Sequence, residues 1–499
     1  MGIEDSGYDS VKEIRMFHST LVSTFRTGKT KDIAWRKWQL KQLWWLVEEN
    51  EQAIVDAIKG DLNRPGFETY LTDLAGIRKD ILYHLDNIDT WTADEPVGDS
   101  FIAKRLGVAR IRKEPLGVVL IIGAWNFPVL LVLQPLIAAI TAGCCAIIKP
   151  SELTVACQNL LRDLVTRYLD PTAIRVVCGG VDETTKLLEL PFNHIFFTGS
   201  ANVGRHISTA AAKSLTPTTL ELGGQCPAIV GRSANLERAA KAIAYSKFLN
   251  AGQICLAVNH VFVDAAVHDE FVKRLRHWSQ QFLHGEQKIT TAIVNQQNWD
   301  RLSSLLQQTK GTVVCGGGQS DELCRMEPAV VIGLDMDDPL LVEEIFGPIC
   351  PILKSDVREA CRTIKSKDYP LALPLEYQDV ITDEKETVLD NTNSGGVTIN
   401  DVILHAGFPG APFGGVGEVD MATIMWFDRL LAFRYPPYSA ANKAKMPKTK
   451  ATFKRGETIQ DQRAKGTRFF GLKFAAGVAL LGILYYCSNF KESFYVLKL

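Results

Sequence analysis

The stretch Gly117-Val-Val-Leu-Ile-Ile122, followed by residues 129–142 and by Ala146-Ile-Ile-Lys149, decides the fold class. The first and third segments are short apolar runs, which are typical of strands buried on both faces of a sheet. The segment between them has the length and apolar content of a buried helix. A strand, a helix and a second strand in this order predict parallel strands joined by a helical crossover, and hence an α/β fold.

The same alternation continues along the chain in two sets separated near Glu221. Residues 9–95, upstream of both sets, have apolar residues at helical spacing and are predicted to be helical. The first set adds helices at 153–168, 183–190 and 202–213 and strands at 174–177 and 194–197. The second set has strands at 228–230, 259–264, 348–354 and 396–400, and helices at 236–250, 267–282 and 299–308.

Composition limits the functional classes. The chain has 499 residues, 46% hydrophobic and 22% charged, which is ordinary for a globular protein of two or three domains. Eleven scattered cysteines without CxxC spacing predict neither a disulfide framework nor a metal site. The net charge is −1, and we find no basic face for nucleic acid.

The segment Phe248-Leu-Asn-Ala-Gly-Gln-Ile-Cys255 is the strongest chemical signal. A lone cysteine is most often a core residue, but here small and polar residues precede it. Glu221 lies upstream in Leu220-Glu-Leu-Gly-Gly224. A thiolate is a strong carbon nucleophile, and a nearby carboxylate can activate water to release an acyl group. This pair indicates thiol-based acyl chemistry.

Together with the motifs given below, these residues resemble the aldehyde dehydrogenases, and most closely their class 3, fatty-aldehyde branch. The resemblance runs from about Val11 to Gly417. It implies a Rossmann-like nucleotide-binding domain, an α/β catalytic domain and a small β bridging or oligomerisation region. The expected division is 1–220 for NAD(P) binding, with the hairpin 101–115 in the bridging region, 221–395 for catalysis, 396–435 for the return segment and bridging region, 436–468 for a basic linker and 469–490 for a hydrophobic tail.

The resemblance assigns three catalytic roles. Cys255 is expected to be the nucleophile, and Glu221 the base that activates the deacylating water. Asn126, in Gly123-Ala-Trp-Asn-Phe-Pro128, is expected to donate to the oxyanion together with the backbone N–H of Cys255. Read without the resemblance, Glu221 is a surface or salt-bridged carboxylate and Asn126 a turn residue between a strand and a helix.

The cofactor residues follow the same pattern, and the expected cofactor is NAD or NADP. Lys149 and Glu152 match residues that hold the adenosine ribose, although a strand end and a capped helix start explain the same sequence. The turn containing Gly199, Ser200 and Gly204 predicts an anion site at a helix N-terminus, or an ordinary turn. The remaining matches are Glu344 and Phe346, which the resemblance places beside the nicotinamide ribose. The alternative is that Glu344 is a solvated acidic residue and Phe346 only its neighbour.

Two departures from the family pattern stand out. The lysine that usually follows Glu-Leu-Gly-Gly is Gln225 in this chain, so a positive charge is lost beside the cofactor residues. After Gly417 the chain continues with Glu418-Val-Asp-Met421 in place of the glycines and Tyr-His-Gly usual in class 3. Backbone that glycine adopts freely is unfavourable for valine and aspartate, so the geometry of the substrate entrance is expected to differ there.

The C-terminal region predicts a membrane tail. Residues 474–487 are free of charge, and residues 441–473 carry ten Lys or Arg against two Asp or Glu. A helix from Phe469 to Cys487 would be about 28 Å long, close to the thickness of a bilayer core. We expect this tail to hold the enzyme on the endoplasmic reticulum or another intracellular membrane, with the body in the cytosol. A helix packed on the body is the alternative.

The combined hypothesis is NAD(P)-dependent oxidation of a hydrophobic aldehyde, fatty or apocarotenoid-like, to its carboxylic acid by a homodimer. One alternative is a membrane-anchored paralogue with weak or no turnover that binds or scaffolds. A second alternative is an acylating enzyme that passes the thioester to a thiol such as coenzyme A. The presence of Glu221 favours hydrolysis.

Overall fold

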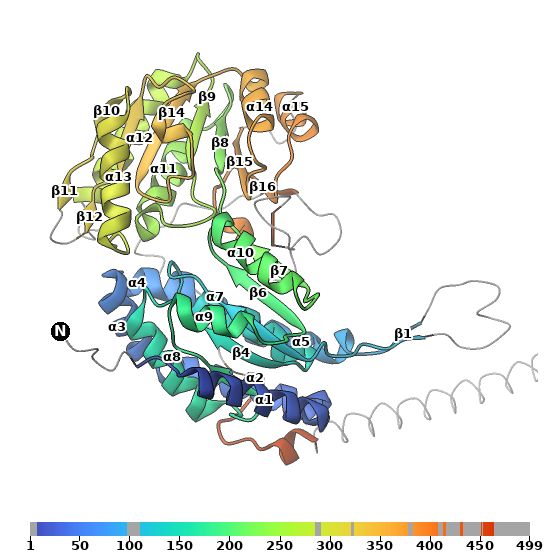
Figure 1. Cartoon of the computed structure of the whole chain (residues 1–499). Coiled ribbons are helices and arrows are strands. Elements are labelled where there is room, and N and C mark those ends of the chain that lie inside the picture. The colour runs from blue at the N-terminus through green and yellow to red at the C-terminus, as the bar shows by residue number, and fades with distance from the viewer. Residues whose placement is uncertain are drawn as a thin grey trace, which may run out of the picture.

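The computed structural model describes residues 7–96, 110–284, 291–320, 324–377, 383–407, 413–415, 430–432, 451 and 453–463. Two α/β bodies make up this part of the chain, as Figure 1 shows. The lower body in that view contains a five-stranded sheet, and the upper body contains an eight-stranded sheet. The α/β fold predicted from the sequence is confirmed.

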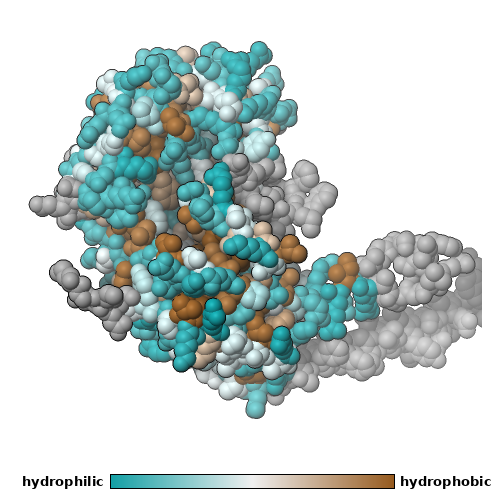
Figure 2. Space-filling view, viewed as in Figure 1, coloured by the Kyte–Doolittle hydropathy of each residue, from teal (hydrophilic) through white to brown (hydrophobic). Residues whose placement is uncertain are grey.

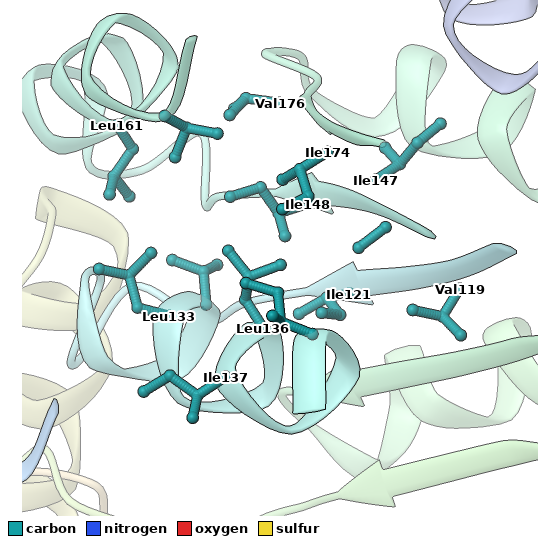
Figure 3. Packing of buried hydrophobic residues seen from close by; sticks show 14 of the residues in the cluster. Val119, Ile121, Leu133, Leu136, Ile137, Ile147, Ile148, Leu161, Ile174 and Val176 are labelled. Carbon is teal, nitrogen blue, oxygen red and sulfur yellow. The ribbon is translucent and has the colours of Figure 1, made fainter. Parts of the chain in front are cut away.

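The five-stranded sheet is parallel throughout and has the order β5-β4-β3-β6-β7. Its strands are β3 (Val118–Ile122), β4 (Cys145–Lys149), β5 (Ile174–Val176), β6 (His194–Thr198) and β7 (Thr218–Glu221). Strands β3 and β4 are buried along their whole length, as their continuous apolar runs predict. Figure 3 shows Leu133 and Leu136 of a crossover helix packed against the branched side chains of this sheet.

Helices cover this sheet on both sides. They are α1 (Val11–Arg26), η1 (Lys29–Lys31), α2 (Ile33–Glu49), α3 (Glu51–Leu62), α4 (Gly66–Thr69), η2 (Tyr70–Leu74), α5 (Ala75–Trp91), α7 (Leu130–Ala142), α8 (Val155–Tyr168), α9 (Val181–Leu188) and α10 (Ala201–Ala212). The apolar stripe of α2 supplies buried tryptophans at 35 and 44, which join the core of the sheet.

The eight-stranded sheet has the order β10-β13-β14-β9-β8-β15-β16-β17, and only β10 runs antiparallel to its neighbour. Its strands are β8 (Pro227–Val230), β9 (His260–Val263), β10 (Thr312–Cys315), β13 (Ala329–Ile332), β14 (Ile349–Lys354), β15 (Ala372–Glu376), β16 (Gly396–Ile399) and β17 (Leu430–Ala432). The helices of this body are α11 (Leu236–Phe248), η3 (Leu249–Gly252), α12 (His268–His284), α13 (Gln296–Gln308), η4 (Pro339–Leu341), α14 (Val357–Lys365), α15 (Asp383–Asn391) and η5 (Leu404–Gly407).

Two short antiparallel pairs complete the described strands: β1 (Glu95–Pro96) with β2 (Arg110–Ile111), and β11 (Gln319–Ser320) with β12 (Arg325–Met326). The first pair projects from the lower body in Figure 1. The strand expected to start the hairpin at residue 101 and its turn at residues 106–108 lie outside the described residues.

Several local predictions need correction. No element was predicted at β10, β13, α14, β15 or α15. The helix predicted to run to Asn250 ends at Phe248, because Asn250 and the next residue have left-handed backbone angles. Strand β7, which ends at Glu221, was missed because its two threonines interrupt the apolar run. Its register with β6 nevertheless pairs Thr198 with Glu221.

Residues 453–463, which we name the strap, pack against helix α2 although they fall inside the segment predicted as a basic linker. Figure 1 shows the strap as the red segment below α2. The ring of Phe453 meets the rings of Trp44 and Trp45 edge-on, with centroids 5.9 and 6.1 Å away. The polar contacts are Trp38 Nε1 to the Glu457 carbonyl (3.0 Å), Lys41 Nζ to Glu457 Oε2 (2.5 Å), Arg455 Nε to Glu49 Oε1 (2.6 Å) and the ion pair of Arg463 with Asp32.

No helix within the described residues is both long and apolar enough to cross a membrane. The predicted tail, residues 469–490, lies outside the described residues. The segment after Gly417 also lies outside them.

Candidate functional site

The predicted site residues gather at the carboxyl edge of the five-stranded sheet. From β3 the chain moves outward to β4 and β5, then returns to the other side of β3 with β6 and β7. This reversal makes a crevice at the carboxyl ends of the strands, where open α/β sheets bind their ligands. Lys149 ends β4, Asn126 follows β3, and Glu221 ends β7.

The turn before Cys255 has an unusual backbone. Asn250, Ala251 and Gly252 have φ values of 52°, 51° and 70°, all in the left-handed region. A Cβ on Gly252 would lie 2.4 Å from the carbonyl oxygen of Gly347, so only glycine fits there. The turn ends the helix and leads into Cys255, a partly exposed residue, while the four residues before it are buried.

A buried network fixes this turn to Asn126. The guanidinium of Arg64 is fully buried, pairs with Asp73 at 2.8 Å and donates to Asn250 Oδ1 at 2.8 Å. Arg64 and Asn250 also both donate to the backbone carbonyl of Asn126. The side-chain amide of Asn126 donates to the carbonyl of Gln253 at 3.2 Å, two residues before the cysteine.

None of these supporting residues was anticipated from the sequence. Arg64 lies among residues 9–95, which we predicted only as helical, and it is 186 positions from Asn250. A charged residue in such a region carries no local signal of a partner so far along the chain.

Burial dominates the acidity of the cysteine. Apolar surroundings raise the pKa of the Cys255 thiol, and the neighbouring Cys226, Glu344 and Glu221 raise it further. The buried thiol of Cys226 donates to the Cys255 carbonyl at 3.2 Å. In this structure the neutral form of the Cys255 thiol is therefore favoured.

The acidic residue at 344 is held against the Glu-Leu-Gly-Gly segment. A Cβ on Gly223 would lie 2.1 Å from Glu344 Oε2, so glycine allows the carboxyl to approach the backbone. Burial raises the pKa of Glu344 to about 8, an effect that a hydrogen bond from the Gly224 N–H opposes. Phe346 has a φ of 44°, and its ring meets the ring of Trp125 edge-on at 5.4 Å. The structure thus brings together two motifs that lie far apart in sequence.

The residues predicted to bind the dinucleotide lie at the same edge of the sheet. Lys149 is buried and forms an ion pair with Glu152. Ser200 caps helix α10 by accepting from the Val203 N–H, and the preceding Gly199 donates to the Glu221 carbonyl at 3.0 Å. A Cβ on Gly204 would lie 2.8 Å from the side chain of Leu222, so this glycine lets the helix pack closely.

These residues fit a dinucleotide. The N-terminus of α10 offers an anion site, and aliphatic side chains stand exposed at the starts of the neighbouring helices. Val181 is 76% exposed and Val203 is 44% exposed. Figure 2 shows apolar side chains gathered across the middle of this face, between the two bodies. A flat aromatic base would cover such side chains.

The sequence model described as the aldehyde dehydrogenase family matches residues 17–424. The chain belongs to the aldehyde dehydrogenase family. The match continues past Gly417, so it includes the segment that departs from the class 3 pattern. The predicted enzyme class and the predicted cofactor, NAD or NADP, are confirmed by this membership.

Several relatives cover most of this dehydrogenase. It is 37% identical to Beta-apo-4'-carotenal oxygenase of Neurospora crassa, over 92% of this chain and 91% of that protein. It is 38% identical to aldehyde dehydrogenase family 3 member A2 of Rattus norvegicus, over 80% of this chain and 83% of that one. The dimeric NADP-preferring aldehyde dehydrogenase of Canis lupus familiaris is 36% identical, over 80% of this chain and 88% of that one.

The solved structures agree on the fold. The substrate-bound state of Staphylococcus aureus AldH superposes with a TM-score of 0.79 at 36% identity, covering 82% of this dehydrogenase and 89% of that chain. An aldehyde dehydrogenase of Mycobacterium tuberculosis in complex with NAD+ has a TM-score of 0.75 at 24% identity, covering 83% and 87%. The second similarity bears on the fold alone.

Proposed function

We propose that this aldehyde dehydrogenase oxidises a hydrophobic aldehyde, of the fatty or apocarotenoid type, to its carboxylic acid. The observation that carries the proposal is the position of Cys255, a partly exposed residue that packs against a buried apolar cluster and follows the turn held by Asn126. Leu131, Tyr245 and Ile403 are partly buried on the same cluster. An apolar chain would bury these side chains further. The similarity to an apocarotenal oxygenase of Neurospora crassa supports the same substrate class.

In the proposed first step the Cys255 thiol releases its proton to solvent, the sulfur bonds to the aldehyde carbon, and the carbonyl oxygen takes the electron pair of the broken π bond. The Cys255 N–H and the Asn126 amide would donate to that oxygen. The amide nitrogen carries two N–H donors, of which one bond, to the Gln253 carbonyl, is formed in this structure, so the second N–H can serve the oxyanion. Removing one such donor from an enzyme typically costs about 2.7–4 kcal/mol of transition-state stabilisation.

NAD or NADP, when bound, supplies the acceptor for the hydride that leaves the same carbon. Lys149 and Glu152 would hold the adenosine ribose, and the turn with Gly199, Ser200 and Gly204 the phosphates. Glu344 and Phe346 would hold the nicotinamide ribose. The carbon is then a thioester on Cys255. Glu221 would take a proton from water, whose oxygen bonds to the acyl carbon while the carbon–sulfur bond breaks. The products are the acid and the free thiol.

Thiol alkylation tests the nucleophile directly. We expect iodoacetamide to modify Cys255 slowly at pH 7 in the cofactor-free enzyme, because burial and nearby carboxylates favour the neutral thiol. Bound NAD+ brings a positive ring and is expected to raise that rate. Cys315, also partly exposed, is the internal control whose rate stays constant.

Turnover completes this test. C255S should lose aldehyde oxidation while keeping its thermal stability, and normal turnover by C255S would overturn the mechanism. Release of the carboxylic acid without an added thiol separates hydrolysis from acyl transfer to coenzyme A.

We also propose that the enzyme is a homodimer held on a membrane by residues 469–490. The dimer rests on the name of the Canis lupus familiaris relative, and the tail rests on the apolar run and the basic residues before it. A chain ending at Arg463 keeps the strap and removes the tail. It should lose flotation with phosphatidylserine vesicles while retaining activity on a short aldehyde. Flotation of the shortened chain would refute the tail.

A further inference from the structure

The loop from Leu341 to Pro348, which we name the cofactor loop, carries Glu344 and Phe346 and has almost no regular structure of its own. Side chains from other elements hold its backbone instead. These contacts are Asn259 Oδ1 with the Ile345 N–H (2.8 Å), Arg301 Nη2 with the Ile345 carbonyl (2.8 Å) and Lys247 Nζ with the Gly347 carbonyl (3.3 Å). Asn259 and Lys247 are buried, and Lys247 and Arg301 are cationic. These contacts therefore fix the end of the loop near Phe346.

The other end of the cofactor loop is held at the Leu341 carbonyl. Gln225 Nε2 donates to that oxygen at 3.2 Å, and Lys367 Nζ donates to it as well. Lys367 also donates to Gln225 Oε1 at 2.8 Å. The three groups form a closed triangle between the segment after Gly224, the loop and the residues that follow helix α14.

The chemistry of glutamine matches this triangle. Its amide has a donor for the Leu341 carbonyl and an acceptor for Lys367, and both are used. A lysine at position 225 has only donors. It would bring a second ammonium group to within hydrogen-bonding distance of Lys367, and the two positive charges would repel each other.

We infer that Gln225 and Lys367 form a positioning pair for the cofactor loop, in which Lys367 supplies the positive charge that residue 225 has lost. The inference rests on the proposed role of Glu344 in holding the cofactor. Neither residue touches the reacting atoms. Their effect is to fix where the loop begins, three residues before Glu344.

A charge exchange tests the pair in the full-length enzyme. K367Q leaves the loop carbonyl without a cationic donor, and Q225K places two ammonium groups together. Each single variant is expected to raise the dissociation constant for NAD or NADP about 10-fold, the equivalent of one hydrogen bond to a charged group. The double variant Q225K/K367Q restores one cation and one amide and is expected to return within about 3-fold of the wild type. K365Q, on the exposed lysine that ends helix α14 two residues before Lys367, is the matched control and should change nothing.

Two further measurements separate positioning from general damage. Hydrogen exchange of residues 341–348 in the cofactor-free enzyme should speed up in both single variants and recover in the double variant. The KM for the cofactor should rise in the single variants, while kcat and the KM for the aldehyde change less than about 3-fold, because uniform binding alone is lost. The inference would be overturned if the two single effects on the cofactor dissociation constant simply added in the double variant. It would also be overturned if K367Q left the hydrogen-exchange rate of residues 341–348 unaltered.

The variant E344A distinguishes this outcome from failure of the proposed function, because alanine removes every side-chain hydrogen bond at this position. If E344A binds the cofactor as the wild type does, the role of Glu344 is wrong. Recovery of hydrogen exchange in the double variant would still report whether the pair positions the loop.

Discussion

Replacing Gly252 with alanine adds one methyl group near the proposed nucleophile, and we expect it to reduce both stability and turnover. The residue has a φ of 70°, and a Cβ there would lie 2.4 Å from the carbonyl oxygen of Gly347. The contact is with backbone, so no side chain can rotate to relieve it. Either the turn before Cys255 or the cofactor loop must move.

The size of the effect follows from these contacts. An alanine in left-handed backbone costs about 1–2 kcal/mol. Moving the Gly347 carbonyl also weakens its hydrogen bond with Lys247, which adds about 1–2 kcal/mol because the donor is charged. The expected loss of unfolding free energy is therefore about 2–4 kcal/mol. A displacement of the sulfur by about 1 Å is expected to lower kcat/KM about 100-fold.

Urea unfolding and aldehyde kinetics of the same preparation measure both effects. The control is G60A, because Gly60 lies inside helix α3 and a Cβ there meets no atom within 4 Å. That substitution should raise the free energy of unfolding by about 0.5–1 kcal/mol and leave turnover unchanged. If G252A unfolds within about 0.5 kcal/mol of the wild type and turns over normally, the packing argument is refuted.

Three other changes have defined outcomes. Glu376 is buried, and its oxygens form no hydrogen bond among the described residues, although Arg238 lies 3.7 Å from Oε2. Burial outweighs this ion pair and raises the pKa of Glu376 from 4.5 to about 8, so stability falls as the pH rises towards 8. E376Q should narrow the difference in melting temperature between pH 6 and pH 9, and an unchanged difference would contradict this. R64M leaves Asp73 as an unpaired buried carboxyl and should lower the free energy of unfolding in urea by about 3–5 kcal/mol. The double variant R64M/D73N should recover part of this loss, and equal stability of R64M and R64M/D73N would argue against the pair. The partly exposed ring of Phe453 packs on Trp44, so F453A should lower the free energy of unfolding by about 2 kcal/mol and shift the tryptophan emission. An unaltered melting temperature and emission would mean that the strap does not contribute to stability.

The sequence by itself determined the α/β alternation and the order of the chemical motifs. Strands such as β3 and β4 are apolar along their whole length, and this local signal fixes their conformation because both faces are covered by helices. The residues 255, 221 and 126 were chosen from their motifs and from the family resemblance, and their catalytic roles stay predictions.

Only the tertiary structure decided what supports those residues. Arg64 meets Asn250 across 186 positions, Lys367 meets Gln225 across 142, and the strap meets helix α2 across more than 400. Each contact joins a charged side chain to a partner that only the tertiary fold brings close. The periodicity of the local sequence does not identify that partner. The segment around 453–463 illustrates this, since its basic composition predicts a solvated linker. Its aromatic ring and paired charges dock on the body because α2 presents the complementary tryptophans and acids.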